Sequence, residues 1–336
     1  MVNFKKPLIT IITSSWNREK YLKKLAYSLN KQSFKNFEWI ISNDGSTDGT
    51  EKFIKSFSKK CNFKITYIHS SLRIGKAKLV NIMLDNLKSK YMVECDSDDY
   101  FLPNSLEILI KLINKIPKSI ENKFVGVFAQ NVDTNGVSQT FKYKIPKSNY
   151  DIKYKDLDEL ADGDGTILFF SKNFKNKRYL EVDYIITESS LLKNIFKGKS
   201  FVLTNKIVKI MDRKSINSVS FGKKLEYNRG SAYSMALTIK NIDFKKYNYF
   251  KRIKIVINYF RYSFHGDLDF RESINKFSPV KSNNIYLMLL PFVFIICVRD
   301  LILNRVKKTH LEFKKNIKKT KIKKFDLARN KVSIIN

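Results

Sequence analysis

Negative charge is scarce in this sequence of 336 residues, in which 31 Asp and Glu stand against 64 Lys and Arg, for a formal net charge of +33. Cysteine is scarce as well, and Cys61, Cys95 and Cys297 show neither CxxC nor Cys/His ligand spacing. The scattered cysteines argue against a zinc site or a disulfide framework and fit a reducing compartment. The basic excess indicates either a solvated Lys-rich surface or an acidic partner, for which nucleic acid or anionic lipid would serve.

Two nucleotide-binding motifs and a leader are also missing. Neither GxxxxGK[ST] nor GxGxxG occurs, so P-loop and dinucleotide-binding proteins lack the phosphate cradle that they need. The first apolar run spans only about six residues, which is too short for a signal peptide. We therefore expect a cytoplasmic protein, free or attached to the cytoplasmic face of a membrane.

What the sequence does contain is a regular alternation of strand-like and helix-like patterns. With 43% hydrophobic residues, the chain can bury a sizeable core. Short β-rich runs predict strands, and apolar residues at helical spacing predict the helices between them. The expected strands are 8–13, 37–42, 63–68, 91–95 and 124–129, and the expected helices are 18–31, 50–57, 76–87 and 104–116. This order predicts an α/β layer fold with a mixed, mostly parallel sheet.

Ligands of such sheets bind outside the carboxyl ends of the strands. Three loops fall at such ends: 14–17 (SSWN), 43–47 (NDGST) and 96–99 (DSDD). The first two carry small polar side chains and free amides that suit a base and a ribose, although an ordinary tight turn also explains NDGST. Asp44 is the residue we expect on the base or ribose, since a carboxylate accepts hydrogen bonds from NH and hydroxyl groups.

The third loop concentrates negative charge, with four acidic residues in the six positions from Glu94 to Asp99. Carboxylates this close repel one another, so a folded chain keeps them in water or around a cation. We expect Asp96 and Asp98 to converge on Mg²⁺ or Mn²⁺, which also bridges a diphosphate. A solvated acidic loop is the alternative. We do not expect the other positive charges of the chain to neutralise this loop.

These residues resemble a known family. The run PLITIITSSWNREKYLKKLAYSLNKQSFKNFEWIISNDGSTDGT resembles the opening of family 2 glycosyltransferases, which have the GT-A fold, and VECDSDDYFLPNSLE is similar to their Asp-x-Asp-Asp strand end. In LRIGKAKLVNIML, Gly75 and Asn81 match the family, whereas Arg73, Leu79 and Val80 replace its usual Asn, Ala and Arg. The resemblance is strong over 6–115, looser over 120–220 and broad beyond.

The resemblance implies a nucleotide-sugar-dependent, metal-dependent, inverting enzyme of capsule, lipopolysaccharide or similar surface-glycan synthesis. It implies Mn²⁺ or Mg²⁺ at Asp96 and Asp98, and an acidic general base from the acceptor half. For the base, Glu188 fits best, with Asp183 and Asp164 as alternatives. The residues implied to bind the donor are Thr13, Ser14, Trp16, Asn17, Asp44, Gly45, Ser46, Gly75, Asn81, Asp96 and Ser97.

The C-terminal region differs in character. Its apolar run 285–298 (IYLMLLPFVFIICV) has fourteen residues, against the roughly 20 of a spanning helix. Ten Lys or Arg and one Glu follow within 305–324. The run suits a buried core helix or an interfacial segment on an anionic membrane, and we expect the latter. The expected domains are a GT-A domain over 1–220 (donor and metal half 1–115, acceptor half 116–220), a helical extension over 221–304 and a basic tail over 305–336.

The expected activity is therefore transfer of a sugar from a nucleotide-sugar donor to a hydroxyl of a glycan or lipid-linked acceptor. A basic nucleic-acid-binding protein is one alternative, and the acidic loop argues against it because that loop would repel phosphates. A nucleotidyltransferase is another, but it would need a Gly-rich phosphate loop where SSWNRE stands. We expect no nucleic-acid partner.

Overall fold

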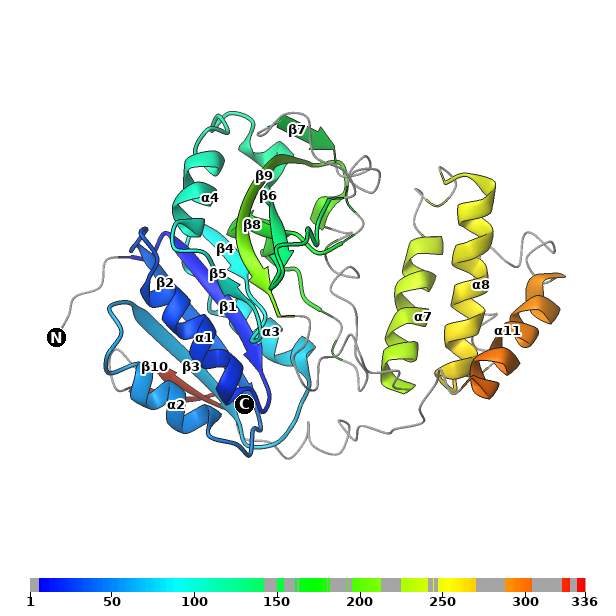
Figure 1. Ribbon diagram of the computed structural model, residues 1–336, viewed down its shortest axis with the longest axis horizontal. Helices are drawn as coiled ribbons and strands as arrows, with labels where there is room; N and C mark the ends of the chain where they lie inside the picture. Colours follow the sequence, from blue (N-terminus) through cyan, green and yellow to red (C-terminus); the bar gives the residue numbers. More distant parts are fainter. Residues whose placement is uncertain are drawn as a thin grey trace. The chain divides into compact units, whose positions relative to one another are not determined.

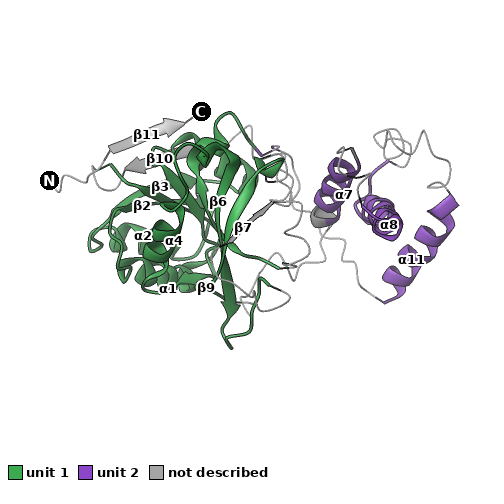
Figure 2. Cartoon of the chain, turned by 90° about the horizontal axis from the view of Figure 1, so that it is seen from above, with its two compact units in different colours: residues 1–178, 193–216, 316–336 green, residues 179–192, 217–315 purple. Residues whose placement is uncertain are grey.

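The computed structural model divides into two compact units, shown in different colours in Figure 2. Unit 1 comprises residues 1–178, 193–216 and 316–336, and unit 2 comprises residues 179–192 and 217–315. The structure describes residues 6–141, 150–153, 161, 163–179, 181, 192, 195–212, 225–240, 244, 247–269, 288–303, 322–326 and 331–335.

Unit 1 is built on a sheet with the strand order β11-β10-β3-β2-β1-β4-β8-β6-β9-β5, with β7 paired to β9 (Figure 1). The strands β1, β2, β3 and β4 run parallel, β8 runs antiparallel to both β4 and β6, and β6 and β9 are parallel. The bounds are β1 Ile9–Ser15, β2 Phe37–Asp44, β3 Lys64–Ser70, β4 Tyr91–Glu94, β5 Tyr100–Phe101, β6 Phe124–Asp133, β7 Tyr150–Lys153, β8 Thr166–Phe170, β9 Ser200–Met211, β10 Ile322–Asp326 and β11 Lys331–Ile335. The predicted α/β fold with a mostly parallel sheet is confirmed.

Helices cover the sheet as the hydrophobic spacing predicts. Helix α1 (Glu19–Asn30) buries Leu22, Leu25, Ala26 and Leu29, one stripe at helical period. These side chains share one core with apolar residues of α2 (Thr50–Phe57) and α4 (Ser105–Ile113), and Figure 1 shows the three helices in front of the strands. Helix α3 (Lys76–Asp85) lies apart from that core and contacts β1 and β2 separately. The β1–β2 pair is therefore buried on both sides, which explains its near-continuous apolar sequence.

Two strands lie where the sequence analysis placed only a basic tail. Strand β10 pairs antiparallel with β3, and β11 pairs antiparallel with β10. They extend the sheet beyond β3, which would otherwise be an open edge. Most of the remaining tail, 304–321, lies outside the described residues.

Unit 2 contains helices α7 (Leu225–Lys240), α8 (Tyr249–His265) and α11 (Leu290–Ile302). A small core joins the three, including Ala232, Tyr259, Phe260 and Val293. Pro291 lies in the first turn of α11, where a missing backbone N–H costs nothing. Across the described part of the chain, every helix is too short or too polar to cross a bilayer.

Candidate active site

The three strand-end loops meet at one edge of the sheet. Strands β2, β1 and β4 are adjacent and parallel, so their carboxyl ends lie side by side. Asn17, at the end of the first loop, holds the second: its N–H donates to Ser46 Oγ (2.8 Å), and its Oδ1 accepts from the N–H of Thr47 (2.8 Å). Asn17 has φ 51°, a left-handed conformation that Asn tolerates better than most residues. The first loop thus holds the second in place through one residue.

The second loop packs tightly against the segment before α3. Gly45 has φ 69°, and a Cβ there would lie 2.7 Å from the carbonyl carbon of Leu72. Only glycine fits this position without strain. Ser46 N–H donates to Asn43 Oδ1 (3.0 Å), which closes the turn.

Asp44 binds the loop that begins α3. Its Oδ1 accepts from the N–H groups of Ile74 (2.6 Å) and Gly75 (3.2 Å), and Arg73 Nε lies 3.8 Å from its Oδ2. Burial raises the pKa of Asp44, and the two amides and Arg73 only partly offset that rise. Asp44 therefore positions the backbone around Gly75. Its contact with a base or ribose stays a prediction.

The indole ring of Trp16 stacks against a cationic side chain. The guanidinium of Arg73 stacks at 3.6 Å from the ring centroid of Trp16, so loop 14–17 and the segment before α3 also meet here. In the sequence, Arg73 is only a departure from the family motif, and no spacing rule connects it to Trp16. Folding brings the two together.

The acidic loop is neutralised by cations from three different elements. Lys76 Nζ, at the start of α3, lies 3.0 Å from Asp96 Oδ1 and 2.9 Å from Glu94 Oε1. Arg18 lies 3.6 Å from Asp98 Oδ2. Lys209, buried on β9, lies 2.7 Å from Asp99 Oδ2. The expectation that the other positive charges of the chain would not neutralise this loop is therefore wrong, because these cations are distant in sequence and only the fold gathers them.

The electrostatics of the loop follow from these contacts. The Lys76 ammonium beside Asp96 lowers the pKa of that carboxyl to about 2, against the opposing effect of burial. Burial raises the pKa of Asp99 to about 6, even with Lys209 in contact. Burial by itself would lower the pKa of Lys209, but the carboxylate of Asp99 has the larger effect, and the pKa of Lys209 is raised. Lys209 therefore stays protonated at neutral pH.

The other predicted donor residues divide into edge and support positions. Ser14 accepts from Ser42 Oγ (3.3 Å) and is half-buried at the edge, and Gly75 (φ 93°) precedes α3. Thr13 is fully buried, and its Oγ1 accepts from Trp39 Nε1 (3.0 Å), so its side chain supports the loop from within. Asn81 and Ser97 are buried as well.

One of the three candidates for the general base lies in the described residues. Glu188 and Asp183 lie outside them. Asp164 is exposed, and its backbone carbonyl accepts from Asn131 Nδ2 (2.9 Å) and Thr140 Oγ1 (2.8 Å). It precedes β8, whose antiparallel register with β4 pairs Leu168 with Val93. The start of β8 therefore lies at the edge from which the acidic loop leaves β4.

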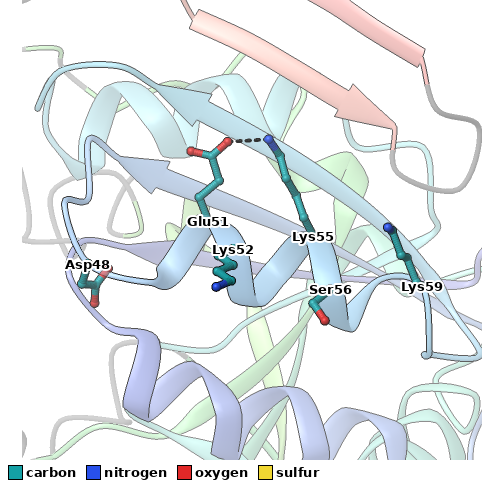
Figure 3. A pocket seen from close by; sticks show the side chains of 6 residues that line it. All are labelled: Asp48, Glu51, Lys52, Lys55, Ser56 and Lys59. Atoms are coloured by element: carbon teal, nitrogen blue, oxygen red, sulfur yellow. Dashed lines mark ion pairs between the residues drawn. The ribbon is translucent and has the colours of Figure 1, made fainter.

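The residues that the sequence analysis missed are cations: Arg18, Lys76 and Lys209. Lys209 carried the only usable signal, since it sits in the apolar run IVKIM of β9, where a lysine must either reach solvent or find a partner. A hollow also opens beside α2, lined by Asp48, Glu51, Lys52, Lys55, Ser56 and Lys59 (Figure 3). Most of its lining comes from the flank of α2 and none from the acidic loop, so the strand-end edge is the stronger candidate.

Half of the chain matches the sequence model of a known protein family. Residues 10–177 match the family model described as Glycosyl transferase family 2. That stretch covers all three strand-end loops and Asp164, and it stops before Glu188 and the helices of unit 2.

Curated relatives are similar over part of their length. A GalNAc(5)-diNAcBac-PP-undecaprenol beta-1,3-glucosyltransferase of Campylobacter jejuni is 26% identical over 200 residues, which is 59% of this chain and 62% of the relative. A putative teichuronic acid biosynthesis glycosyltransferase, TuaG of Bacillus subtilis, is 33% identical over 107 residues, 32% of this chain and 42% of the relative. The chain therefore spans less than two thirds of these relatives.

Solved structures with low sequence identity share the fold. S. aureus TarS in complex with UDP-GlcNAc superposes with a TM-score of 0.56 at 16% identity, covering 76% of this chain and 72% of that chain. The mannosyltransferase PcManGT from Pyrobaculum calidifontis, in complex with GDP-Man and Mn²⁺, gives a TM-score of 0.52 at 12% identity, covering 88% and 81%.

Proposed function

This chain belongs to glycosyl transferase family 2, and on that premise we propose that it transfers a sugar, with inversion, from a nucleoside-diphosphate donor to a hydroxyl group of a lipid-linked glycan. The observation that carries the proposal is the meeting of the β1, β2 and β4 loops at one sheet edge. At one end of that edge lie Trp16 and backbone amides, and at the other end lie the carboxylates of Asp96 and Asp98, each beside a cation. A nucleotide-sugar donor has a flat base at one end and a charged diphosphate at the other, so its two ends match the two ends of the sheet edge.

The donor would lie across this edge. In the proposal, Trp16 and Arg73 border the base, and Asp44 binds the base or the ribose. Asn17, Gly45 and Ser46 fix the conformation of the loops that carry them. In the proposal, Asp96 and Asp98 lie toward the diphosphate, and Lys76 and Arg18, which pair with those two carboxylates, contact the phosphate oxygens. The base, the ribose and the diphosphate of the donor thus each have their own group of contacting residues in the proposal.

A divalent ion fits this site by its donor chemistry. Asp96 and Asp98 offer hard carboxylate oxygens two positions apart in the sequence, and the side chain of Asp96 is 53% exposed. Among the described residues, His, Cys, Asp and Glu form no group of three or more suited to a metal. These two carboxylates would supply only part of the shell of an ion, and phosphate oxygens of the donor and water would supply the rest. When bound, Mn²⁺ or Mg²⁺ would offset the negative charge of the diphosphate.

The reaction is a single displacement. An acidic residue takes the proton from the acceptor hydroxyl, the oxygen bonds to the anomeric carbon, and the bond from that carbon to the diphosphate oxygen breaks. Attack opposite the leaving group inverts the anomeric centre. Glu188 remains the first proposal for the base, with Asp183 and Asp164 as the alternatives. Asp164 gains support from its place at the sheet edge.

The names of the relatives and the positive charge of the chain support a proposal for the acceptor and the location. The Campylobacter relative's name states a polyprenyl-diphosphate-linked acceptor. For this chain we propose a lipid-linked acceptor of surface-glycan synthesis at the cytoplasmic face of the membrane, with an anionic lipid surface as a further partner.

The test is the substitution Asp98→Asn, which removes one carboxylate charge and keeps the side-chain volume. Release of UDP or GDP from a panel of nucleotide-sugars with Mn²⁺ should fall at least about 100-fold if the carboxylate acts mainly in the transition state. Asp85→Asn, at the far end of α3, makes the same chemical change to a residue paired with Arg178 and should leave turnover unchanged. Turnover of Asp98→Asn equal to that of Asp85→Asn would refute the proposed role.

A further inference from the structure

Helix α11 presents two faces of opposite character. Val293, Cys297 and Asp300 recur at intervals of four and three residues and are buried. Val293 and Cys297 share the core of unit 2 with Val256, Tyr259 and Phe260 of α8. One side of α11 is therefore packed as the side of a globular helix should be.

A buried carboxylate fixes the rotation of α11 against α8. Asp300 Oδ2 accepts from Arg261 Nε at 2.6 Å and lies 3.2 Å from His265 Nε2, while its Oδ1 accepts from Arg299 at 3.2 Å. Three cationic or ring groups converge on one side chain, and two of them come from α8. Rotating α11 would break these charge-assisted bonds, so the opposite face is held outward.

That outward face is almost wholly apolar. Its large side chains are exposed, from 36% for Val298 to 75% for Ile302. The other members are Phe292, Phe294, Ile295 and Leu301, with Met288 and Leu303 at the two ends of the helix. They cover every turn of the helix, so they form a continuous patch rather than scattered single residues. A contiguous exposed apolar patch of this kind marks an interaction surface.

The helix that packs against α11 carries charge of one sign. Besides Arg261, which pairs with Asp300, α8 has Lys251, Arg252 and Lys254 and no Asp or Glu, and the single acid of α11 is the buried Asp300. In the sequence, the stretch directly after α11 holds ten Lys or Arg and one Glu over 305–324. An apolar face with cationic surroundings complements an anionic bilayer, where apolar burial and headgroup attraction add. A second copy of the same surface would bring like charges together.

We propose that the outward face of α11 is the surface by which this protein lies on an anionic lipid bilayer, with its apolar side chains at the headgroup boundary. The inference deepens the proposed function and rests on it in one respect, the lipid-linked acceptor. It names the docking face as the non-buried side of a 13-residue helix.

The experiment is sedimentation of the full chain with vesicles of phosphatidylcholine alone or mixed with phosphatidylglycerol. Wild type should pellet with the anionic vesicles, and the triple variant Phe292→Gln, Ile295→Gln, Ile302→Gln should bind at least about tenfold more weakly. Gln keeps helix propensity. The matched control is Tyr27→Gln on α1, where Tyr27 is 59% exposed, and it should bind as wild type does.

A second variant reports the insertion of α11 into the bilayer by a gain of signal rather than by a loss of binding. Phe294→Trp should shift its fluorescence emission to the blue when anionic vesicles are added. The inference is overturned if that emission stays unchanged, if wild type stays in the supernatant, or if the triple variant pellets like wild type. It is also overturned if light scattering shows that the triple variant breaks a dimer while neither protein binds vesicles.

Failure of this inference and failure of the proposed function are separable. Asp98→Asn should lose nucleotide-sugar turnover and still pellet with anionic vesicles. The triple variant should keep release of nucleoside diphosphate from soluble donor and lose vesicle binding.

Discussion

The acidic loop of unit 1 and helix α11 of unit 2 are the two most unusual stretches of the sequence, and the fold treats them in opposite ways. Asp96, Asp98 and Asp99 each lie beside a cation from a distant element, so a locally repulsive cluster becomes a balanced one. The apolar residues of α11 receive cover on one side of the helix only. Local composition marks both stretches as needing a partner. The fold itself brings cations to the first stretch, whereas we place the partner of the second outside the chain.

The largest expected effect breaks the balance of the acidic loop. Lys209→Met should lower the free energy of unfolding by about 3–5 kcal/mol, because Asp99 would stay buried without its counter-charge. Adding Asp99→Asn to Lys209→Met should recover most of that loss. Urea unfolding measures both, and Lys206→Met, at an exposed position of the same strand, is the control. A loss no larger than that of Lys206→Met would mean that the pair contributes nothing to stability.

A smaller effect should follow in unit 2. Asp300→Asn removes the charge that Arg261 and His265 contact, at a cost of about 2 kcal/mol to the packing of α11 on α8. Because α7, α8 and α11 belong to the second unit, hydrogen exchange should quicken in α8 and α11 and stay unchanged in β1 and β2. The same substitution should weaken vesicle binding, since the apolar face would no longer be held outward. Unchanged exchange in α11 would contradict the positioning role of Asp300.

The smallest effect concerns pH. The pKa of Asp96 is lowered to about 2 from an ordinary 3.8, so its pairing with Lys76 adds stability above about pH 4 that is lost as the pH falls toward 2. Half of the Asp96 side chain is exposed, so solvent screening limits the contribution to under about 1 kcal/mol. Lys76→Gln should flatten that part of the acid-unfolding curve. Lys52→Gln, on the flank of α2 (Figure 3), should leave it unchanged.

The sequence predicted the alternating half of the fold well, for a clear physical reason. Strands β1 to β4 and helices α1 to α4 have apolar patterns that match their own period, and each loop between them has polar turn residues. The carboxyl-edge rule then placed the loops of Asn17, Asp44 and Asp96 side by side. Strand β8 was not predicted, because an antiparallel insertion between two parallel strands has no local signature. Strands β10 and β11 were missed because Lys-rich stretches have low strand propensity.

The apolar run 285–298 admitted two readings, a buried helix or an interfacial one. In the structure, Val293 and Cys297 are buried, as in a core helix, whereas Phe292, Phe294 and Ile295 are exposed, as an interfacial helix requires. The sequence could not separate the faces because the run is apolar all round. Asp300, three residues beyond Cys297, pairs with Arg261 and His265 and lies on the same inward side as Val293 and Cys297.

The sequence by itself determined the α/β class, the order of the parallel strands' loops and the family, because periodicity and short motifs are local properties of the chain. The tertiary structure alone decided which charges meet. Arg18, Lys76 and Lys209 are separated by 58 and 133 residues along the chain, yet all three reach the loop of Asp96 to Asp99. Coulomb interactions depend on distance in space, and no local pattern records that distance.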